Sequence, residues 1–209
     1  MYPKSIQKLI DLFSQFPTVG PRTAARFVFY LIKLPQAELE ELSSSLKELK
    51  ENIKICSWCF NSFDSSSNSG QASSGQAGSG EICPICEDKT RDKSLLCIIE
   101  KETDLTTIEK TKKYKGLYFI LGGTINLKKR DKKDIRIEQL KERVKDNGFK
   151  EVIIAINPTT EGEITRLLIE RELKPFNVKI THLGRGLPMG GELEYADSDT
   201  LSNSFDSRK

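Results

Sequence analysis

The chain has 209 residues and a mass of 23.6 kDa, enough for one large domain or for a few small ones. Its 33 Lys and Arg against 30 Asp and Glu leave a net charge of +3, which excludes a histone-like polycation and an acidic solvating chain. No apolar run reaches the length of a membrane span, and the first residues lack a signal-peptide core. We therefore expect a cytoplasmic protein that has no membrane partner.

Residues 1–54 are predicted to form a helical domain. Apolar residues between Ile6 and Phe16 recur at helical spacing, and Pro17-Thr18-Val19-Gly20-Pro21 interrupts them. Pro21 suits the first position of a second helix, and Pro35 opens a third. The apolar residues of the third helix alternate spacings of three and four: Leu39, Leu42, Leu46, Leu49 and Ile53. Such a seam packs on a neighbouring helix, either in this chain or in another.

The junction between the first two helices is a candidate phosphate-binding site. Gly20 and Pro21 would form a tight turn that leaves backbone N–H groups free at the start of the second helix. Arg22 and Arg26 would add positive charge there. Such a site reads no bases, so DNA binding would be independent of sequence and sensitive to salt. An ordinary helical hairpin without a ligand explains the same residues equally well.

Four of the five cysteines form two C-x-x-C pairs: Cys56, Cys59, Cys83 and Cys86. Each spacing lets one tight turn present two sulfurs, and four thiolates satisfy tetrahedral Zn²⁺. Residues 55–92 are therefore predicted to form a zinc finger with one structural ion, interrupted by a Ser/Gly-rich insertion at 64–80. A catalytic zinc is not expected, because four protein thiolates leave no open position for water.

Residues 93–183 are predicted to form an α/β domain, because short apolar runs alternate with helical stretches. Strands are expected at 95–99, 117–121, 152–156 and 178–183, in a parallel sheet. Helices are expected from about Asp104, over 137–145 before Gly148, and over 163–173. Cys97 lies inside the first strand and is expected to be a buried small hydrophobic residue.

An acidic set lies at the carboxyl ends of two of these strands. Glu100 closes the first strand, Asp104 lies four residues further on, and Glu161 and Glu163 follow the third strand. Carboxylates at this edge of a parallel sheet could hold Mg²⁺, or they could complement helix dipoles. For Asp104 we favour the helix dipole, and for the other three residues both interpretations stay open.

Three further features narrow the functional classes. His182 is the only histidine, which argues against a His-based metal site or paired His acid–base chemistry. The Gly-rich segment 184–191 lacks the Gly-Lys-Ser/Thr ending of a P-loop, so a nucleotide triphosphatase is excluded and a turn at an interface is preferred. Basic runs at 110–115 and 128–133 are either a local basic patch or a solvated surface.

Several of these stretches together resemble the bacterial RecR family of recombination mediator proteins. The resemblance covers nearly the whole chain except 64–80. It is carried by the stretch Phe16-Pro17-Thr18-Val19-Gly20-Pro21-Arg22-Thr23-Ala24, by the two cysteine pairs, by the segments 91–100 and 156–163, and by Arg185-Gly186-Leu187-Pro188-Met189-Gly190-Gly191 with the residues up to Asp197. It implies an α+β multidomain fold with a helix-hairpin-helix (1–54), a four-cysteine zinc finger, a Toprim-like domain with a parallel sheet and a C-terminal assembly segment (184–209).

The resemblance also implies a function. Proteins of this family are non-enzymatic and bind single- and double-stranded DNA in gap and double-strand-break repair. They form homodimers and ring-shaped homotetramers that can encircle DNA, and with RecO and, in many bacteria, RecF they load recombinase onto single strands. On this sequence the DNA-binding residues would be Gly20, Arg22, Thr23 and Arg26. The surface of Glu100, Asp104, Glu161 and Glu163 would meet RecO or neighbouring subunits.

The main alternative is a Toprim-type metal-dependent enzyme, a nuclease or a topoisomerase. Toprim enzymes usually pair a strand-end Glu with an Asp-x-Asp after a later strand, but here that strand ends in Asn157-Pro158-Thr159. A third option is a protein–protein adaptor without DNA affinity. The chain also departs from the family in its long Ser/Gly insertion and in the Lys-rich segment 128–133, where partner contacts are in doubt.

Overall fold

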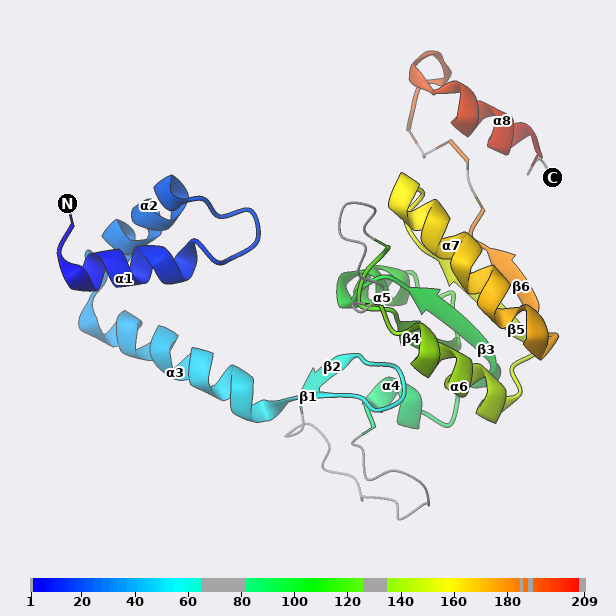
Figure 1. Ribbon diagram of the computed structural model, residues 1–209, viewed down its shortest axis with the longest axis horizontal. Helices are drawn as coiled ribbons and strands as arrows, with labels where there is room; N and C mark the ends of the chain where they lie inside the picture. Colours follow the sequence, from blue (N-terminus) through cyan, green and yellow to red (C-terminus); the bar gives the residue numbers. More distant parts are fainter. Residues whose placement is uncertain (1, 65–81, 126–134, 185, 188–189, 207–209) are drawn as a thin grey trace. The chain divides into compact units, whose positions relative to one another are not determined.

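The computed structural model describes residues 2–64, 82–125, 135–184, 186–187 and 190–206 (Figure 1). The chain divides into two compact units, Met1–Ile53 and Lys54–Lys209. Nearly all of the Ser/Gly-rich insertion and the whole Lys-rich segment 128–133 lie outside the described residues, as do Arg185, Pro188 and Met189. Within the described ranges, no helix is both long and apolar enough to cross a bilayer.

The first unit consists of three helices, α1 (Lys4–Phe13), α2 (Pro21–Leu31) and α3 (Gln36–Asn52), as predicted. Helices α1 and α2 pack through a small core of Ile10, Ala24 and Val28, and Pro21 occupies the first position of α2. Helix α3 buries none of its residues, and the seam leucines Leu42, Leu46 and Leu49 are exposed. Within the first unit this seam is therefore uncovered, so another helix could pack on it.

The turn between α1 and α2 lies earlier than the sequence suggested. Thr18 has a left-handed backbone, with φ 65°, and the Val19 N–H donates to the Phe16 carbonyl over 3.1 Å. Gly20 is extended, with φ −85°, and caps α2. The prediction of a tight turn at Gly20 and Pro21 is therefore wrong: the chain reverses at residues 16–19, and Gly20 leads directly into the helix.

The second unit begins with short elements that the sequence did not predict. Strands β1 (Ile53–Ile55) and β2 (Ser62–Asp64) form a two-stranded sheet, and α4 (Pro84–Glu87) is a single turn. These three elements carry or adjoin the four cysteines. Their small core consists of the cysteines themselves and Phe63. So few apolar side chains cannot stabilise such a module alone, which is why small modules of this kind usually need a metal.

A four-stranded parallel sheet follows, with the strand order β4-β3-β5-β6. Its strands are β3 (Asp92–Ile99), β4 (Gly116–Ile120), β5 (Glu151–Ala155) and β6 (Lys179–His182). The prediction of a parallel sheet is confirmed, and the ends of β4, β5 and β6 agree with the predicted strands to within a residue. Strand β3 begins three residues early and has a register shift between Asp92 and Leu96.

Helices cover both faces of this sheet (Figure 1). Alternate residues of β3 point to opposite faces, so Leu96 and Ile98 join one core while Cys97 and Ile99 join the other. The first core packs against α6 (Ile137–Asn147) and α7 (Thr160–Leu173), and the second against α5 (Glu102–Lys110). Cys97 is buried as expected, and burial raises its pKa to about 12, so this thiol is inert at neutral pH.

Side-chain and backbone caps set the ends of these helices. The Asp104 carboxylate accepts the Lys101 backbone N–H over 3.1 Å, so α5 begins at Glu102. The Thr159 hydroxyl oxygen accepts the Gly162 N–H, so α7 begins at Thr160, earlier than predicted. Gly148 ends α6 in a left-handed conformation, as expected.

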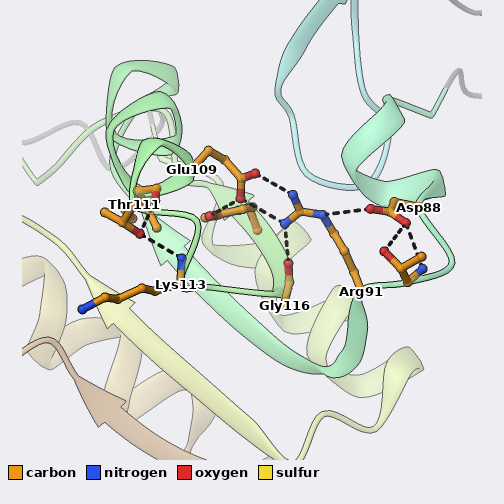
Figure 2. A network of polar contacts seen from close by, with 9 residues as sticks. Asp88, Arg91, Glu109, Thr111, Lys113 and Gly116 are labelled. Carbon is orange, nitrogen blue, oxygen red and sulfur yellow. Dashed lines mark hydrogen bonds and ion pairs between the residues drawn. The ribbon is translucent and has the colours of Figure 1, made fainter.

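An ion pair ties the start of β3 to α5 and β4 (Figure 2). The Arg91 guanidinium donates to both Glu109 carboxylate oxygens, over 3.0 and 2.6 Å, and to the Gly116 carbonyl over 3.1 Å. The Tyr118 hydroxyl donates to the same carboxylate over 2.6 Å. Only 11% of the Arg91 side chain is exposed, so this bidentate pair holds the chain where it leaves the cysteine module and enters the sheet.

The end of the chain forms the short helices η4 (Leu193–Tyr195) and α8 (Ser198–Asp206). The sequence did not predict α8. Its segment, Ser-Asp-Thr-Leu-Ser-Asn-Ser-Phe-Asp, is rich in residues with weak intrinsic helix propensity. Leu193, Tyr195 and Phe205 are exposed, which leaves apolar surface on the C-terminal segment.

Candidate metal centre and nucleic-acid interface

The four cysteines of the C-x-x-C pairs meet at one point. Cys56 and Cys59 belong to the turn between β1 and β2, while Cys83 caps α4 and Cys86 lies within it. All four are at most 1% exposed, their sulfurs lie within 4.8 Å of one another, and none forms a disulfide. The sequence prediction that the two pairs converge is confirmed.

The local backbone explains how each pair presents its sulfurs. The Phe60 N–H donates to the Cys56 carbonyl over 3.0 Å, and Phe60 takes a left-handed conformation, with φ 63°. The Cys86 N–H donates to the Cys83 carbonyl over 3.0 Å, so the second pair lies in one tight turn. The Cys83 N–H also donates to the Cys56 sulfur over 3.4 Å, which joins the two pairs.

This arrangement fits a tetrahedral metal ion. Zinc–sulfur bonds of about 2.3 Å in a tetrahedron place the sulfurs about 3.8 Å apart. The Cys59 and Cys83 sulfurs are 3.5 Å apart, close to that spacing and far longer than a disulfide bond of about 2 Å. Among the residues with described coordinates, this is the sole group of three or more potential ligands, and it contains only sulfur donors.

The electrostatics of the thiols lead to the same conclusion. Hydrogen bonds with Cys59, Cys83 and Cys86 lower the pKa of Cys56, whereas hydrogen bonds with Cys56, Cys59 and Cys83 raise the pKa of Cys86. Four buried sulfurs at this spacing cannot all carry a negative charge unless a cation lies among them. The cluster therefore suits a soft divalent ion that turns every thiol into a thiolate.

The cysteine module is bonded to the edge of the parallel sheet. The Ile120 N–H, on edge strand β4, donates to the Cys59 carbonyl over 2.9 Å. Phe60 packs edge-to-face on Phe119, with ring centroids 5.4 Å apart. The Arg136 guanidinium lies over the Phe60 ring at 4.6 Å and donates to the Ile120 carbonyl over 2.9 Å. Both main-chain groups of Ile120 therefore take part in holding the module on the sheet: its N–H bonds the Cys59 carbonyl, and its carbonyl bonds Arg136.

In the first unit, the candidate DNA-binding residues lie at the start of α2. Gly20 caps this helix without any side-chain cap, and Pro21 has no N–H, so the N–H groups of the first turn face outward from the helix end. Arg22 and Arg26 are exposed and lie one helical turn apart on the same face, with Thr23 half-buried beside them. The arrangement offers both backbone donors and positive charge to a phosphate.

The acidic residues lie near the carboxyl edge of the parallel sheet, but they have separate partners. The Glu100 carboxylate accepts the Asn157 side-chain amide over 2.9 Å. The Asp104 carboxylate caps α5, and that of Glu163 pairs with Arg166 over 2.9 Å, while Glu161 is exposed in the first turn of α7. Among the described residues, no three carboxylates gather within 4.8 Å of one another.

A cleft opens at the same edge of the sheet. It is lined by Asp104, Asn157, Arg166 and His182, together with residues of the C-terminal segment. His182 ends β6, and its Nε2 lies 2.9 Å from the Glu170 carboxylate, which already holds Arg166. The only histidine therefore contacts a surface carboxylate that also pairs with Arg166.

Sequence reasoning missed the arginines that surround the cysteine module. Arg91, Arg136 and Arg143 were not singled out, although each makes a specific contact with the module or with the chain that leaves it. Arg136 and Arg143 are seven residues apart, a spacing that returns to the same face of a helix. That spacing could have indicated a shared face, but not its partner.

Comparison with known proteins agrees with this architecture. Residues 6–50 match the family model described as RecR, helix-hairpin-helix, residues 94–184 match the Toprim domain, and residues 186–209 match RecR, C-terminal. The chain is 40% identical to the Recombination protein RecR of Bifidobacterium animalis subsp. lactis over all 209 residues, covering 97% of that relative. It is similarly 40% identical to that of Rubrobacter xylanophilus, covering 98% of it, and 39% identical to that of Clostridium perfringens, covering 97%. The chain therefore belongs to the RecR family of recombination proteins.

Proposed function

We propose that this chain is a non-enzymatic recombination mediator that binds single- and double-stranded DNA without sequence preference. It acts in the cytoplasm as an oligomeric clamp, a homodimer or a ring-shaped homotetramer, and loads recombinase onto single strands together with RecO and RecF. The observation that carries this proposal is the uncapped start of α2 beside the exposed Arg22 and Arg26. Backbone N–H groups and guanidinium groups bind phosphates, which every DNA sequence presents alike.

Titration of labelled single- and double-stranded oligonucleotides, followed by fluorescence anisotropy, tests DNA binding. Wild-type protein should bind both at low salt and lose affinity steeply as salt rises. In Arg22→Ala and in Arg26→Ala, the plot of log affinity against log salt should become less steep, its negative slope smaller in magnitude by about one. Arg171→Ala, which removes an exposed arginine of α7, is the matched control and should bind as wild type does. Unchanged binding by both hairpin variants would remove α2 from the mechanism.

The same preparations separate the three functional classes. A Toprim-type enzyme would cut or relax labelled DNA in the presence of Mg²⁺ or Mn²⁺, and a pure adaptor would not bind DNA even at low salt. The separate partners of Glu100, Asp104 and Glu163 support the mediator over the enzyme, since two-metal chemistry requires carboxylates that converge on the ions.

We propose further that the four cysteines hold one structural Zn²⁺ per chain. Their burial, spacing and all-sulfur composition support zinc, and four protein ligands leave it no catalytic position. Elemental analysis of reduced, freshly purified protein should give about one zinc per chain. Chelation should unfold the residues around the site, because metal binding supplies their folding free energy. Protein that contains no metal would contradict this assignment.

The acidic edge is proposed as the surface that meets RecO or a neighbouring subunit. Glu161 is exposed there, and Glu100 and Asp104 are held in place by hydrogen bonds, so the edge presents fixed negative charge. Charge complementarity of this kind mainly raises the association rate and weakens with salt. Co-elution with purified RecO at low salt, lost in Glu161→Lys, is the expected result.

A further inference from the structure

Arg143 of α6 is a buried cation at the cysteine module. Only 9% of this residue is exposed, and its guanidinium lies 4.5 Å above the centre of the Trp58 ring. Trp58 stands next to Cys59 in the sequence, within the first C-x-x-C pair. The guanidinium also lies 5.9 Å from the Phe149 ring. Arg143 therefore reaches from the parallel-sheet domain to the residue beside a metal ligand.

The Arg143 guanidinium lacks the partners that a buried charge normally requires. Its Nε and Nη2 have no hydrogen-bond partner among the described residues, although both are inaccessible to solvent. Within the same residues, no carboxylate forms an ion pair with it. An uncompensated buried cation is strongly unfavourable, and stacking on an indole ring offsets only part of that cost. A further source of negative charge is needed nearby.

The cysteine sulfurs supply that charge. Burial lowers the pKa of Arg143 and the charges of Cys86, Cys56 and Cys59 oppose this, while the guanidinium itself stacks on Trp58, the residue next to Cys59. A divalent ion with four thiolates carries two net negative charges, which are themselves buried and need an outer cation. The orphaned guanidinium and the excess thiolate charge therefore complement each other.

Arg136, seven residues before Arg143, is a second arginine at the cysteine module and can be compared with it. Its guanidinium also stacks on a ring beside a cysteine, that of Phe60, but it donates to the Ile120 carbonyl over 2.9 Å. Arg136 thus has a neutral hydrogen-bond partner of its own, whereas two nitrogens of Arg143 have none in the part of the chain that the structure describes. The hydrogen bond of Arg136 explains its partial burial, whereas the charge of Arg143 has to be balanced by the nearby cysteine module.

We propose that Arg143 is a positioning residue of the zinc site, whose guanidinium balances the thiolate charge and slows loss of the ion. The inference rests on the proposed zinc. It makes retention of the metal depend on a helix of the Toprim-like domain as well as on the four ligands. Removal of an outer-shell partner typically costs roughly 10–100-fold in metal affinity.

Two measurements on metal-loaded, full-length protein test this role. The first is the rate of zinc transfer to an excess of a chromophoric chelator, and the second is the sulfur-to-metal charge-transfer band of the Co²⁺-substituted protein. Arg143→Met should release zinc roughly 10–100-fold faster than wild type. Its charge-transfer band should move to longer wavelength, because a thiolate without a nearby cation gives up an electron more easily. Arg143→Lys, which keeps the charge, should restore most of both properties.

Two control variants separate charge from packing. Lys145→Met removes an exposed cation from the same helix and should leave both measurements unchanged. Arg136→Met removes the other stacked arginine and should leave the Co²⁺ band in place even where it weakens the fold. Release and spectra of Arg143→Met equal to those of wild type would overturn the proposal. Equal defects in Arg143→Met and Arg143→Lys would also overturn it, because packing alone would then explain them.

The outcomes also distinguish this inference from the zinc assignment. Wild-type protein that takes up no Zn²⁺ or Co²⁺ would overturn both, whereas metal-loaded protein that is indifferent to Arg143 would overturn only the role of the arginine. Should Arg143→Met fail to fold, Arg143→Lys decides alone. Slow release with an unshifted band then supports the proposal, and fast release with a shifted band overturns it.

Discussion

Glu109 shows how much one carboxylate can hold together in this chain. It accepts hydrogen bonds from Arg91 and Tyr118, and through Arg91 it fixes the start of β3 (Figure 2). Glu109→Gln keeps the shape but removes the charge that compensates a guanidinium only 11% exposed. We expect the free energy of unfolding to fall by about 2 kcal/mol, measured by urea denaturation of zinc-saturated protein.

The control for Glu109 is Glu138→Gln, which removes an exposed pair with Lys141. The Glu138 carboxylate is 3.0 Å from the Lys141 amine, but its side chain is 77% exposed, so the loss of unfolding free energy should stay below about 0.5 kcal/mol.

The pH dependence of the unfolding free energy gives a second check on Glu109. Hydrogen bonds from Arg91 lower the pKa of Glu109. The advantage of wild type over Glu109→Gln is therefore complete above the unfolded pKa of about 4.3 and vanishes as pH falls through the lower folded pKa. An equal difference at neutral pH and well below both pKa values would contradict this account.

At the scale of the elements, the start of α7 leaves no room for a side chain at Gly162. A Cβ at Gly162 would lie 1.9 Å from the Asn157 carbonyl oxygen, so a methyl group fits only if the backbone moves. Gly162→Ala should lower the free energy of unfolding by about 2–3 kcal/mol in urea denaturation followed by circular dichroism. Gly20→Ala is its control, because Gly20 has φ −85° and no atom within 4 Å of a built Cβ. Equal unfolding free energies of the two variants would show that the backbone at Asn157 moves to accommodate the methyl group without loss of stability.

The helices and strands were predictable wherever one local signal was strong. Apolar runs such as 95–99 identified the buried strands, and Pro21 and Gly148 marked helix ends through their own backbone preferences. Strands β1 and β2 were not predictable, because three residues each are too few to show a period. The start of α7 was placed late, since the Thr159 cap depends on a hydrogen bond rather than on the apolar pattern.

The candidate site was predictable in its ligands and not in its surroundings. Two C-x-x-C pairs identify the four cysteines because their spacing is itself the geometric requirement of the metal. The arginine contacts depend on how α6 folds back onto the Cys59 turn, which brings Arg143 beside Trp58 across 85 positions of sequence. No local pattern records such a contact, so only the folded structure identifies Arg143.

At the scale of the whole molecule, the exposed leucines of α3 bear on how chains associate. In the proposed oligomeric clamp we expect the seam of α3 to be buried between chains, because nothing in the first unit covers Leu42, Leu46 and Leu49. Leu46→Glu should lower the mass measured by light scattering toward that of a monomer while helicity stays unchanged. Lys47→Glu adds negative charge off the seam and should leave the mass unaltered. A wild-type monomer, with or without DNA, would exclude a clamp.

The hydrogen bond between the Ile120 N–H and the Cys59 carbonyl means that the cysteine module also protects an edge of the parallel sheet. Strand β4 lies at the border of the parallel sheet, where unpaired main-chain groups are a template for pairing with foreign strands. The Cys59 carbonyl and the Arg136 guanidinium occupy the outward N–H and C=O of Ile120. With zinc bound at the cysteines as proposed, loss of the metal would do more than unfold this module. It would expose the main-chain groups of edge strand β4 and favour aggregation of the protein.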